Sequence, residues 1–283
     1  MINSLNLSVA IPDSCLSDEQ TKRDKSIKIW QFARACSIFK VTRIYIYHDK
    51  TTKLKKEDAD LIKTILRYLD TPQYLRKTLY SKISHLEYAG LLHPIKAPHH
   101  KERVDIKKIK SGDIRVGVIQ NVSGRLFVEA GLDALIPYKG LGYKGKKIDI
   151  KFVSPYPNLM AQDAREEDIR NCSYWGYKVK EVHSLCELFK SSLNKEVLIT
   201  SRAGAFFKNK EEKLVQRLKS NNNLLVIFGS PRKGLEEIMS SEGMNINEYE
   251  FVVNMFPFQG TETVRLEEAI LGTLAILNHV LVR

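Results

Sequence analysis

Three short segments in the C-terminal third of the chain combine small, hydroxyl and basic residues, and each directly follows a stretch that is expected to form a strand. Residues 200–204 read TSRAG, residues 229–234 read GSPRKG and residues 257–263 read PFQGTET. In open α/β sheets, ligands bind beyond the carboxyl ends of the strands, where such loops collect. The loops therefore predict a small-molecule site, although glycine-containing turns alone do not identify its ligand.

The motifs that these loops lack disfavour several enzyme classes. None of the three has the G-x-x-x-x-G-K-[ST] pattern of a phosphate-binding loop or the G-x-G-x-x-G dinucleotide pattern. The chain has no G-x-S-x-G elbow, which disfavours a hydrolase triad. The adjacent His99 and His100 lack further ligands nearby in the sequence, so we expect no metal site.

The cysteines and the apolar segments bear on the cellular compartment. The four cysteines are scattered without C-x-x-C spacing, which is typical of free thiols in a reducing cytosol. The longest apolar stretch, residues 269–282, is too short and too polar to span a bilayer, and residues 1–16 lack the pattern of a signal peptide. We therefore expect a cytoplasmic protein with no membrane contact.

The positive charge of the chain is concentrated in its first half. The formal net charge of the 283 residues is +12, with +6 on residues 1–95 and +7 on residues 96–151, whereas residues 152–194 carry −1 and residues 195–283 are neutral. A basic segment of this density commonly meets polyanions, and nucleic acid is the usual one. This uneven distribution of charge predicts one part of the chain that binds a polyanion and a separate part with a different function.

The basic middle segment has the pattern of a small β-barrel. Short strand-like runs separated by glycines are typical of a closed barrel, of which the OB fold is the commonest nucleic-acid-binding version, and an SH3-like barrel would have a similar pattern. The five runs lie at residues 103–106, 114–120, 125–129, 134–137 and 147–153.

The flanking segments have an α/β rhythm, and they are the elements that must position the three loops. Residues 224–228 (LLVIF) are fully apolar, as expected of a central parallel strand. We predict one α/β domain built from residues 1–95 and 155–283, with the barrel, residues 96–154, inserted into it. Its other strands are expected at residues 5–12, 43–47, 177–182, 197–200 and 251–256, and the helices at residues 18–39, 55–69, 73–80, 183–191, 209–219, 234–240 and 262–282.

The C-terminal string at residues 254–271 (NMFPFQGTETVRLEEAIL) resembles the knot segment of the SPOUT-class RNA methyltransferases that carry an inserted OB-like domain. These are archaeal and eukaryotic proteins related to the eukaryotic rRNA uridine-N3 methyltransferases. The resemblance extends over nearly the whole chain, but residues 230–233 (SPRK) form a longer and more basic loop than the family pattern. Further matching strings are RIYIY at 43–47, YLDTPQYLRK at 68–77, GLLHP at 90–94, APHH at 97–100, YWGY at 174–177, LITS at 198–201 and GLEE at 234–237.

The resemblance implies a trefoil-knotted parallel sheet, with the knot near residues 198–283, and a bent S-adenosylmethionine held by the three loops. It also implies a homodimer and methylation of uridine N3 in large-subunit rRNA. Apolar residues at the strand ends would hold adenine, and glycines would let the backbone approach the ligand. The cofactor-binding residues that we expect are Thr200, Gly229, Asn254, Phe256, Gln259, Gly260 and Thr263.

Methylation at uridine N3 requires the loss of an imide proton. A cation near the oxygens of the base would favour this loss, because it stabilises the resulting anion. Arg265, beside the last loop, is the first choice for this cation and Arg202 the second. Glu267 or Glu268 could act as a base or orient Arg265, but acidic residues are also ordinary at a helix N-terminus.

The inserted barrel is expected to hold RNA through basic side chains on phosphates and aromatic side chains on bases. Two alternatives to rRNA uridine-N3 methylation remain: a non-catalytic RNA-binding or ribosome-assembly protein that keeps the fold, and a methyltransferase with another RNA position or substrate. The candidate RNA-binding residues are Lys107, Lys108, Lys110, Arg115, Arg125, Tyr138, Tyr143, Lys144, Lys146 and Lys147.

Overall fold

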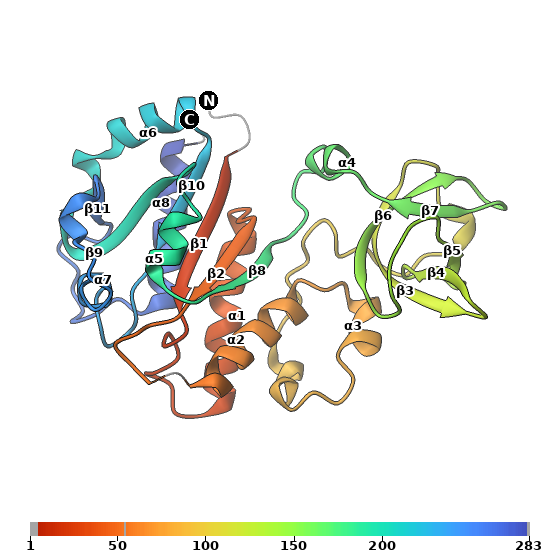
Figure 1. Cartoon of the computed structure of the whole chain (residues 1–283), viewed down its shortest axis with the longest axis horizontal. Coiled ribbons are helices and arrows are strands. Elements are labelled where there is room, and N and C mark those ends of the chain that lie inside the picture. The colour runs from red at the N-terminus through yellow and green to blue at the C-terminus, as the bar shows by residue number, and fades with distance from the viewer. Residues whose placement is uncertain (1–4, 54, 282–283) are drawn as a thin grey trace. The chain divides into compact units, whose positions relative to one another are not determined.

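The structure is a computed structural model that describes residues 5–53 and 55–281 (Figure 1). The ends of the predicted domain and knot, residues 1–4 and 282–283, lie outside the described residues. The chain forms two compact units. The first unit contains the chain up to Arg67, His85–Ile95 and the chain from Tyr177 onward, and the second contains Tyr68–Ser84 and Lys96–Gly176.

A six-stranded sheet forms the centre of the first unit, and all of its strand pairs are parallel. Leu224–Ile227 is fully buried, as the apolar run predicts for an inner strand. The α/β class and the parallel sheet predicted from the sequence are confirmed. The strands, in their order across the sheet, are β11 (Phe251–Asn254), β9 (Glu196–Phe206), β10 (Asn223–Ile227), β1 (Asn6–Pro12), β2 (Arg43–Tyr47) and β8 (Lys178–Val182).

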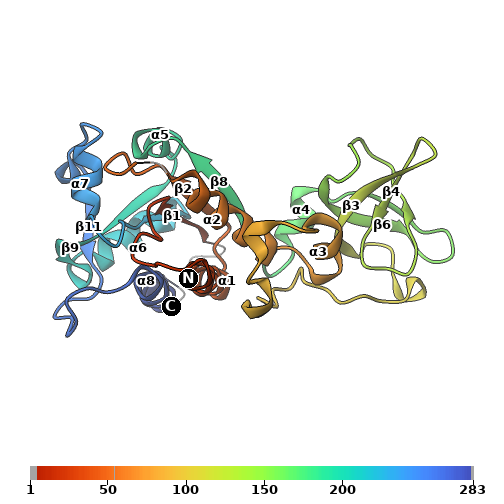
Figure 2. The ribbon, with the colours of Figure 1, turned by 90° about the horizontal axis from the view of Figure 1, so that it is seen from below.

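Helices cover both faces of this sheet (Figure 2). The long helices α1 (Lys22–Ile38) and α8 (Leu266–Leu281) lie side by side on one face, and α5 (Leu185–Lys190) and α7 (Leu235–Ser240) lie on the other. Thr21 caps α1 by accepting a hydrogen bond from the Asp24 backbone N–H at 3.1 Å. The first unit also contains α2 (Lys56–Leu69), whose last two residues belong to the second unit, and α6 (Glu211–Ser220).

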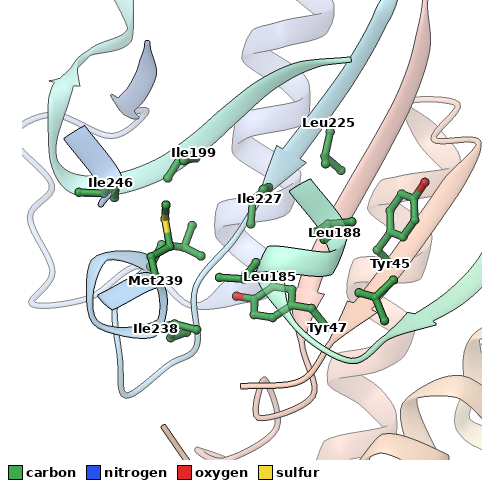
Figure 3. Packing of buried hydrophobic residues seen from close by; sticks show 13 residues of the cluster. Tyr45, Tyr47, Leu185, Leu188, Ile199, Leu225, Ile227, Ile238, Met239 and Ile246 are labelled. Atoms are coloured by element: carbon green, nitrogen blue, oxygen red, sulfur yellow. The ribbon is translucent and has the colours of Figure 1, made fainter. Parts of the chain in front are cut away.

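The face that carries α5 and α7 is closed by one hydrophobic cluster (Figure 3). Leu185 and Leu188 of α5 and Ile238 of α7 are completely buried against strand residues such as Ile227. Each fully buried aliphatic side chain of this kind contributes about 1.5–3 kcal/mol. Tyr47 is also buried there, and its hydroxyl donates to the Phe228 carbonyl oxygen at 2.6 Å, which fixes the chain where it leaves β10.

The second unit contains a five-stranded antiparallel sheet. Its edges meet, because Tyr138 forms a bridge with Ala161 and the Lys139 backbone N–H donates to the Ala161 carbonyl oxygen at 2.8 Å. Its core is apolar and includes the fully buried Ile119 and Val128. The strands, in order, are β5 (Ile136–Pro137), β4 (Arg125–Glu129), β3 (Ile114–Val122), β6 (Lys147–Ser154) and β7 (Met160–Asp163).

The second unit extends beyond the predicted inserted segment, residues 96–154. Strand β7 completes its sheet, and Trp175 Nε1 donates to Asp149 at 2.8 Å. Helix α3 (Gln73–Leu79) also belongs to it, because the buried Tyr74 donates to the Val116 carbonyl oxygen at 2.7 Å. A short helix, α4 (Glu166–Arg170), follows β7.

Two local expectations were wrong. Residues 103–106 do not form a strand, because Asp105 starts a 3-10 turn by accepting from the Lys107 backbone N–H, and Val104 makes only an isolated bridge. The strand expected at residues 197–200 does not end there: β9 runs on to Phe206 with a bulge at residues 200–204, because Ile199 pairs with Val252 and Ala205 with Val253. Gly204 permits this extension, since a Cβ there would lie 2.7 Å from the Val253 backbone of β11.

Candidate functional site

A cavity of about 390 Å³ lies in the first unit, at the carboxyl ends of β10 and β11 and beside the bulge of β9. The structure brings together the three segments singled out in the sequence, residues 200–204, 229–234 and 257–263, and adds the N-terminal half of α8. Parallel pairing explains this convergence, because parallel strands place their carboxyl ends at one edge of the sheet. The volume lies within the range of small-molecule sites, about 300–1,000 Å³.

Six of the seven expected cofactor-binding residues line this cavity. Gly260 is not among them: it is exposed, and a Cβ added there would have no atom of the chain within 4 Å. The protein itself therefore does not require glycine at this position. The six lining residues are Thr200, Gly229, Asn254, Phe256, Gln259 and Thr263.

The side-chain amides of Asn254 and Gln259 form hydrogen bonds to the backbone of the first and third segments. Asn254 Nδ2 donates to the Arg202 carbonyl oxygen at 3.0 Å, and Asn254 Oδ1 accepts from the Phe256 backbone N–H at 2.9 Å. Gln259 Nε2 donates to the carbonyl oxygens of Thr261 and Glu262 at 2.9 and 3.1 Å. Both side-chain amides thus form hydrogen bonds within the protein. We therefore expect backbone groups to supply much of the polar recognition of a ligand in this cavity.

The second segment forms a tight turn before α7. The Ser230 backbone N–H donates to the Lys233 carbonyl oxygen at 3.0 Å, and the Lys233 N–H donates to Ser230 Oγ at 3.0 Å. A Cβ at Gly229 would lie only 3.1 Å from the Lys233 carbonyl oxygen and from the Leu235 nitrogen. Glycine at position 229 therefore fits the close packing of this turn against the start of α7.

The inner part of the cavity is apolar. Phe228, Val253, Met255 and Leu266 line it and are buried. Phe228, the last residue of the apolar run at 224–228, is thus both a core residue and part of the cavity wall. The surface is apolar enough to receive a flat aromatic ring, and the ring of Phe256 forms a further part of the wall.

The outer part of the cavity carries charges of both signs. Arg232 Nη2 donates to the Ser17 carbonyl oxygen at 3.0 Å, and Lys233 Nζ lies 3.7 Å from Glu237. Glu236 also lines the cavity. The basic character of this loop is visible in the sequence, but nothing in the sequence pattern shows that these side chains line a cavity together with the other two segments.

The three expected catalytic residues have different surroundings. Arg202 lines the cavity, and its Nη1 donates to the Glu262 carbonyl oxygen at 3.0 Å. Arg265, just before α8, is not among the lining residues; its side chain is 64% exposed, and Nη1 lies 3.9 Å from Glu19. Its backbone N–H donates to Glu268 at 2.9 Å, so Glu268 caps the helix.

Glu267 has a structural contact. It is buried and absent from the cavity lining, and its carboxylate lies 3.5 Å from Lys28 Nζ on α1. Lys28 is 2% exposed and also contacts Asp18 at 2.5 Å. The pair joins α8 to α1, which favours a structural over a catalytic role for Glu267.

The apolar surface near the cavity includes an aromatic pair. Phe258, whose neighbours Phe256 and Gln259 are close to it in the sequence and line the cavity, is 91% exposed. Its ring lies edge-on to Phe206 at 5.4 Å between centroids. Phe258 has a φ of 59°, which is uncommon for a side chain of this size. The alternation of polar and apolar residues along the expected strands does not predict this exposed aromatic pair.

Two of the expected RNA-binding residues of the second unit have buried side chains. Arg115 is 3% exposed: its guanidinium donates to the carbonyl oxygens of Ala130 and Glu102, and it lies over the Tyr74 ring. Tyr138 is 8% exposed and donates to Asp163 at 2.7 Å. Neither side chain is available to bind a strand of RNA at the surface.

The other eight candidates are exposed. Tyr143 is 70% exposed, in the segment between β5 and β6 that also exposes Leu141. Lys147 Nζ lies 3.1 Å from the Asp70 carboxylate, which partly neutralises it. The exposed candidates are Lys107, Lys108, Lys110, Arg125, Tyr143, Lys144, Lys146 and Lys147.

The histidine pair and the cysteines show no metal-binding arrangement. Among residues 5–53 and 55–281, no group of three or more His, Cys, Asp or Glu side chains is placed to hold a metal ion. The His99 ring is buried beside Asp70, with Nε2 at 2.9 Å from the Asp70 carbonyl oxygen, and Cys15 and Cys36 are buried thiols. Within the same described residues, none of the helices is both long and apolar enough for a membrane span.

Comparison with known proteins connects the sequence of the chain to one family. The family model described as "Putative RNA methyltransferase" matches residues 6–277. The 28S rRNA (uridine-N(3))-methyltransferase of Drosophila melanogaster is 29% identical over 317 aligned residues, which cover 98% of this chain and 62% of that protein. The human protein of the same name is 27% identical, over 98% of this chain and 79% of its own length. An uncharacterized protein of Haloarcula marismortui is 26% identical, over 97% of this chain and 99% of its own length.

Proposed function

Because the chain belongs to this family of RNA methyltransferases, we propose that it transfers the methyl group of S-adenosylmethionine to N3 of a uridine in large-subunit rRNA. The observation that carries the proposal is the cavity at the carboxyl ends of β10 and β11 and the bulge of β9, where the three segments expected to hold the methyl donor come together. The names of the fly and human relatives support the choice of uridine N3.

The chemistry of the cavity fits S-adenosylmethionine. The buried wall of Phe228, Val253 and Leu266 suits the adenine ring. The outer wall offers Arg232 and Lys233 to a carboxylate and Glu236 to an ammonium group, which matches the zwitterionic end of the ligand. When bound, S-adenosylmethionine supplies an electrophilic methyl group.

Arg202 is the best placed of the expected catalytic residues. Loss of the N3 proton leaves negative charge on the uracil oxygens, which a nearby guanidinium stabilises. A guanidinium carries five N–H donors, so the bond to Glu262 leaves donors for a substrate oxygen. We assign Arg265 to a second contact with the substrate, outside the cavity, because its side chain is exposed and its neighbours Val264 and Leu266 line the cavity. Glu267 is assigned to positioning α8 through Lys28.

We further propose that the second unit is an OB-like module that delivers RNA to the first. The basic side chains Lys107, Lys108, Lys110, Lys144 and Lys146 are exposed and suit phosphate contacts, and Tyr143 suits base stacking. This division of work agrees with the excess positive charge of the segment.

We propose that the chain from residue 198 onward forms a trefoil knot and that two copies of the chain pair through this segment. Exposed apolar side chains on this segment, Phe258 at 91% and Leu271 at 46%, support a paired surface. The free thiols are consistent with the reducing cytoplasm, where we place the reaction.

The test is methyl transfer to large-subunit rRNA, followed by mass spectrometry of the nucleosides. The wild-type chain is expected to produce 3-methyluridine. Arg202→Ala should lower turnover by about 10²–10³-fold, the usual effect of removing one group that stabilises developing negative charge. Lys219→Ala, an exposed change at the end of α6, is the control. Binding of the methyl donor without any methylated nucleoside would instead favour a non-catalytic RNA-binding protein.

A further inference from the structure

Thr273 of α8 has an unusual position in the cavity wall. It lines the cavity together with Leu266 and Ala269, which lie on the same side of the helix. The residue is 0% exposed, and its hydroxyl Oγ1 has no hydrogen-bond partner. A buried hydroxyl without a partner is costly, so its presence at the wall of a cavity points to a partner that comes from outside the chain.

The ordinary ways of satisfying this hydroxyl are not used. A threonine inside a helix commonly donates to the carbonyl oxygen four residues earlier, here that of Ala269. Thr200, in the same wall, is satisfied within the protein, because its hydroxyl donates to the Ile227 carbonyl oxygen at 2.9 Å. Of the cavity-lining side chains that the structure describes, Thr273 is the one with a buried oxygen that lacks a partner.

Thr273 shares its side of α8 with Leu266, a buried apolar residue of the cavity wall, and this indicates which part of a ligand reaches it. The cavity is apolar and buried near Phe228 and Val253, and charged near Arg232 and Glu236, which are exposed. A zwitterionic amino-acid group belongs with the charges. A flat heterocycle with ring nitrogens belongs in the apolar part, where one hydroxyl can meet a nitrogen at the edge of the ring.

The residue before Thr273 supports this arrangement. A Cβ at Gly272 would lie 2.5 Å from Cε1 of the Phe256 ring, so glycine allows this ring, itself part of the cavity wall, to approach α8 closely. The cavity is thus lined both by an aromatic ring packed against α8 and by the unpaired hydroxyl of the next residue in the helix.

We infer that the Thr273 hydroxyl is a hydrogen-bonding partner of the adenine ring of the methyl donor and contributes to its selection. The inference rests on the proposed function, because it assumes that the cavity binds S-adenosylmethionine. It adds a recognition contact from the last helix to those expected from residues 200–204, 229–234 and 257–263. The adenine is held against Phe256 and Phe228, and a purine nitrogen or the amino group at its edge completes the hydroxyl's bonding.

The experiment is calorimetric binding of S-adenosylhomocysteine and of adenosine to the full chain. Thr273→Val keeps the shape but removes the hydroxyl, and it should weaken both ligands by roughly tenfold. Thr273→Ser keeps a hydroxyl and should remain within roughly threefold of wild type. Without ligand, Thr273→Val should melt at the same temperature as wild type or about 2 °C higher, since an unpaired buried group is removed.

The outcomes separate the inference from the function on which it rests. Wild-type affinity in Thr273→Val overturns the inference and leaves the proposed function intact. A lower melting temperature of Thr273→Val without ligand also overturns it, because the hydroxyl would then have a partner within the protein. A wild-type chain that binds neither ligand overturns the proposed function, and the inference with it.

Discussion

Replacing Gly272 with alanine tests whether the packing of α8 against Phe256 shapes the cavity. The new Cβ would lie 2.5 Å from Phe256 Cε1 and 2.7 Å from Cζ. Carbon atoms in contact are ~3.5–4.0 Å apart, so the ring must move by about 1 Å or more. Because Phe256 also lines the cavity, movement away from α8 changes the space that a ligand occupies.

Two opposing effects determine how much Gly272→Ala changes the free energy of unfolding. Overpacking costs about 1–3 kcal/mol. Alanine in place of glycine inside a helix gains about 1 kcal/mol, so the free energy of unfolding should fall by at most about 2 kcal/mol. Ligand binding has no such offset, and we expect the affinity for S-adenosylhomocysteine to fall about tenfold or more, which corresponds to about 1.4 kcal/mol.

Calorimetry and thermal melting measure these two effects separately. The matched control is Gly90→Ala, also in the first unit, because a Cβ at that glycine meets no atom within 4 Å. The control should bind S-adenosylhomocysteine as wild type does. Wild-type affinity in Gly272→Ala would refute the reasoning, since the Phe256 ring could then move without altering the site.

Further predictions concern Glu267 in the first unit and the basic side chains of the second unit. Glu267→Gln should lower the free energy of unfolding by at most about 3 kcal/mol, because Lys28 keeps Asp18 as a partner. Turnover of the folded protein should change less than about threefold. If Glu267 were a general base, its loss would instead lower turnover by ~10²–10⁴-fold. In the second unit, Lys144→Ala with Lys146→Ala should lower the salt dependence of RNA binding by roughly 1–2 in the slope of log K against log salt. Arg115→Met should leave that slope unchanged and instead lower the melting temperature, and the opposite pattern would restore Arg115 as an RNA contact.

The sequence predicted much of the first unit because its signals are local. The apolar run at residues 224–228 and the helical periodicity of residues 18–39 correspond to β10 and α1. The convergence of the three segments also followed from the general geometry of parallel sheets. Their hydrogen-bonded connections, such as that from Asn254 to Arg202, depend on the actual path of the chain and could not be predicted.

The sequence was less informative where distant residues decide the environment. Arg115 occurs in a basic, strand-like segment, and only the fold shows that carbonyl oxygens surround its guanidinium. The contact between Lys28 and Glu267 joins opposite ends of the chain, so the acidic start of the last helix gave no hint of it. Thr273 fits the pattern of a core helix, and its unpaired hydroxyl is visible only in three dimensions.

The most direct test of the account is a crystal structure of the chain with S-adenosylhomocysteine. We predict that the ligand lies in the cavity lined by residues 200–203, 229–237 and 253–256, with its adenine in the apolar part beside Thr273. Its amino-acid end should lie near Arg232 and Glu236. A ligand bound elsewhere, or this cavity closed while the ligand is bound, would contradict the assignment of a methyl-donor site to these strand ends.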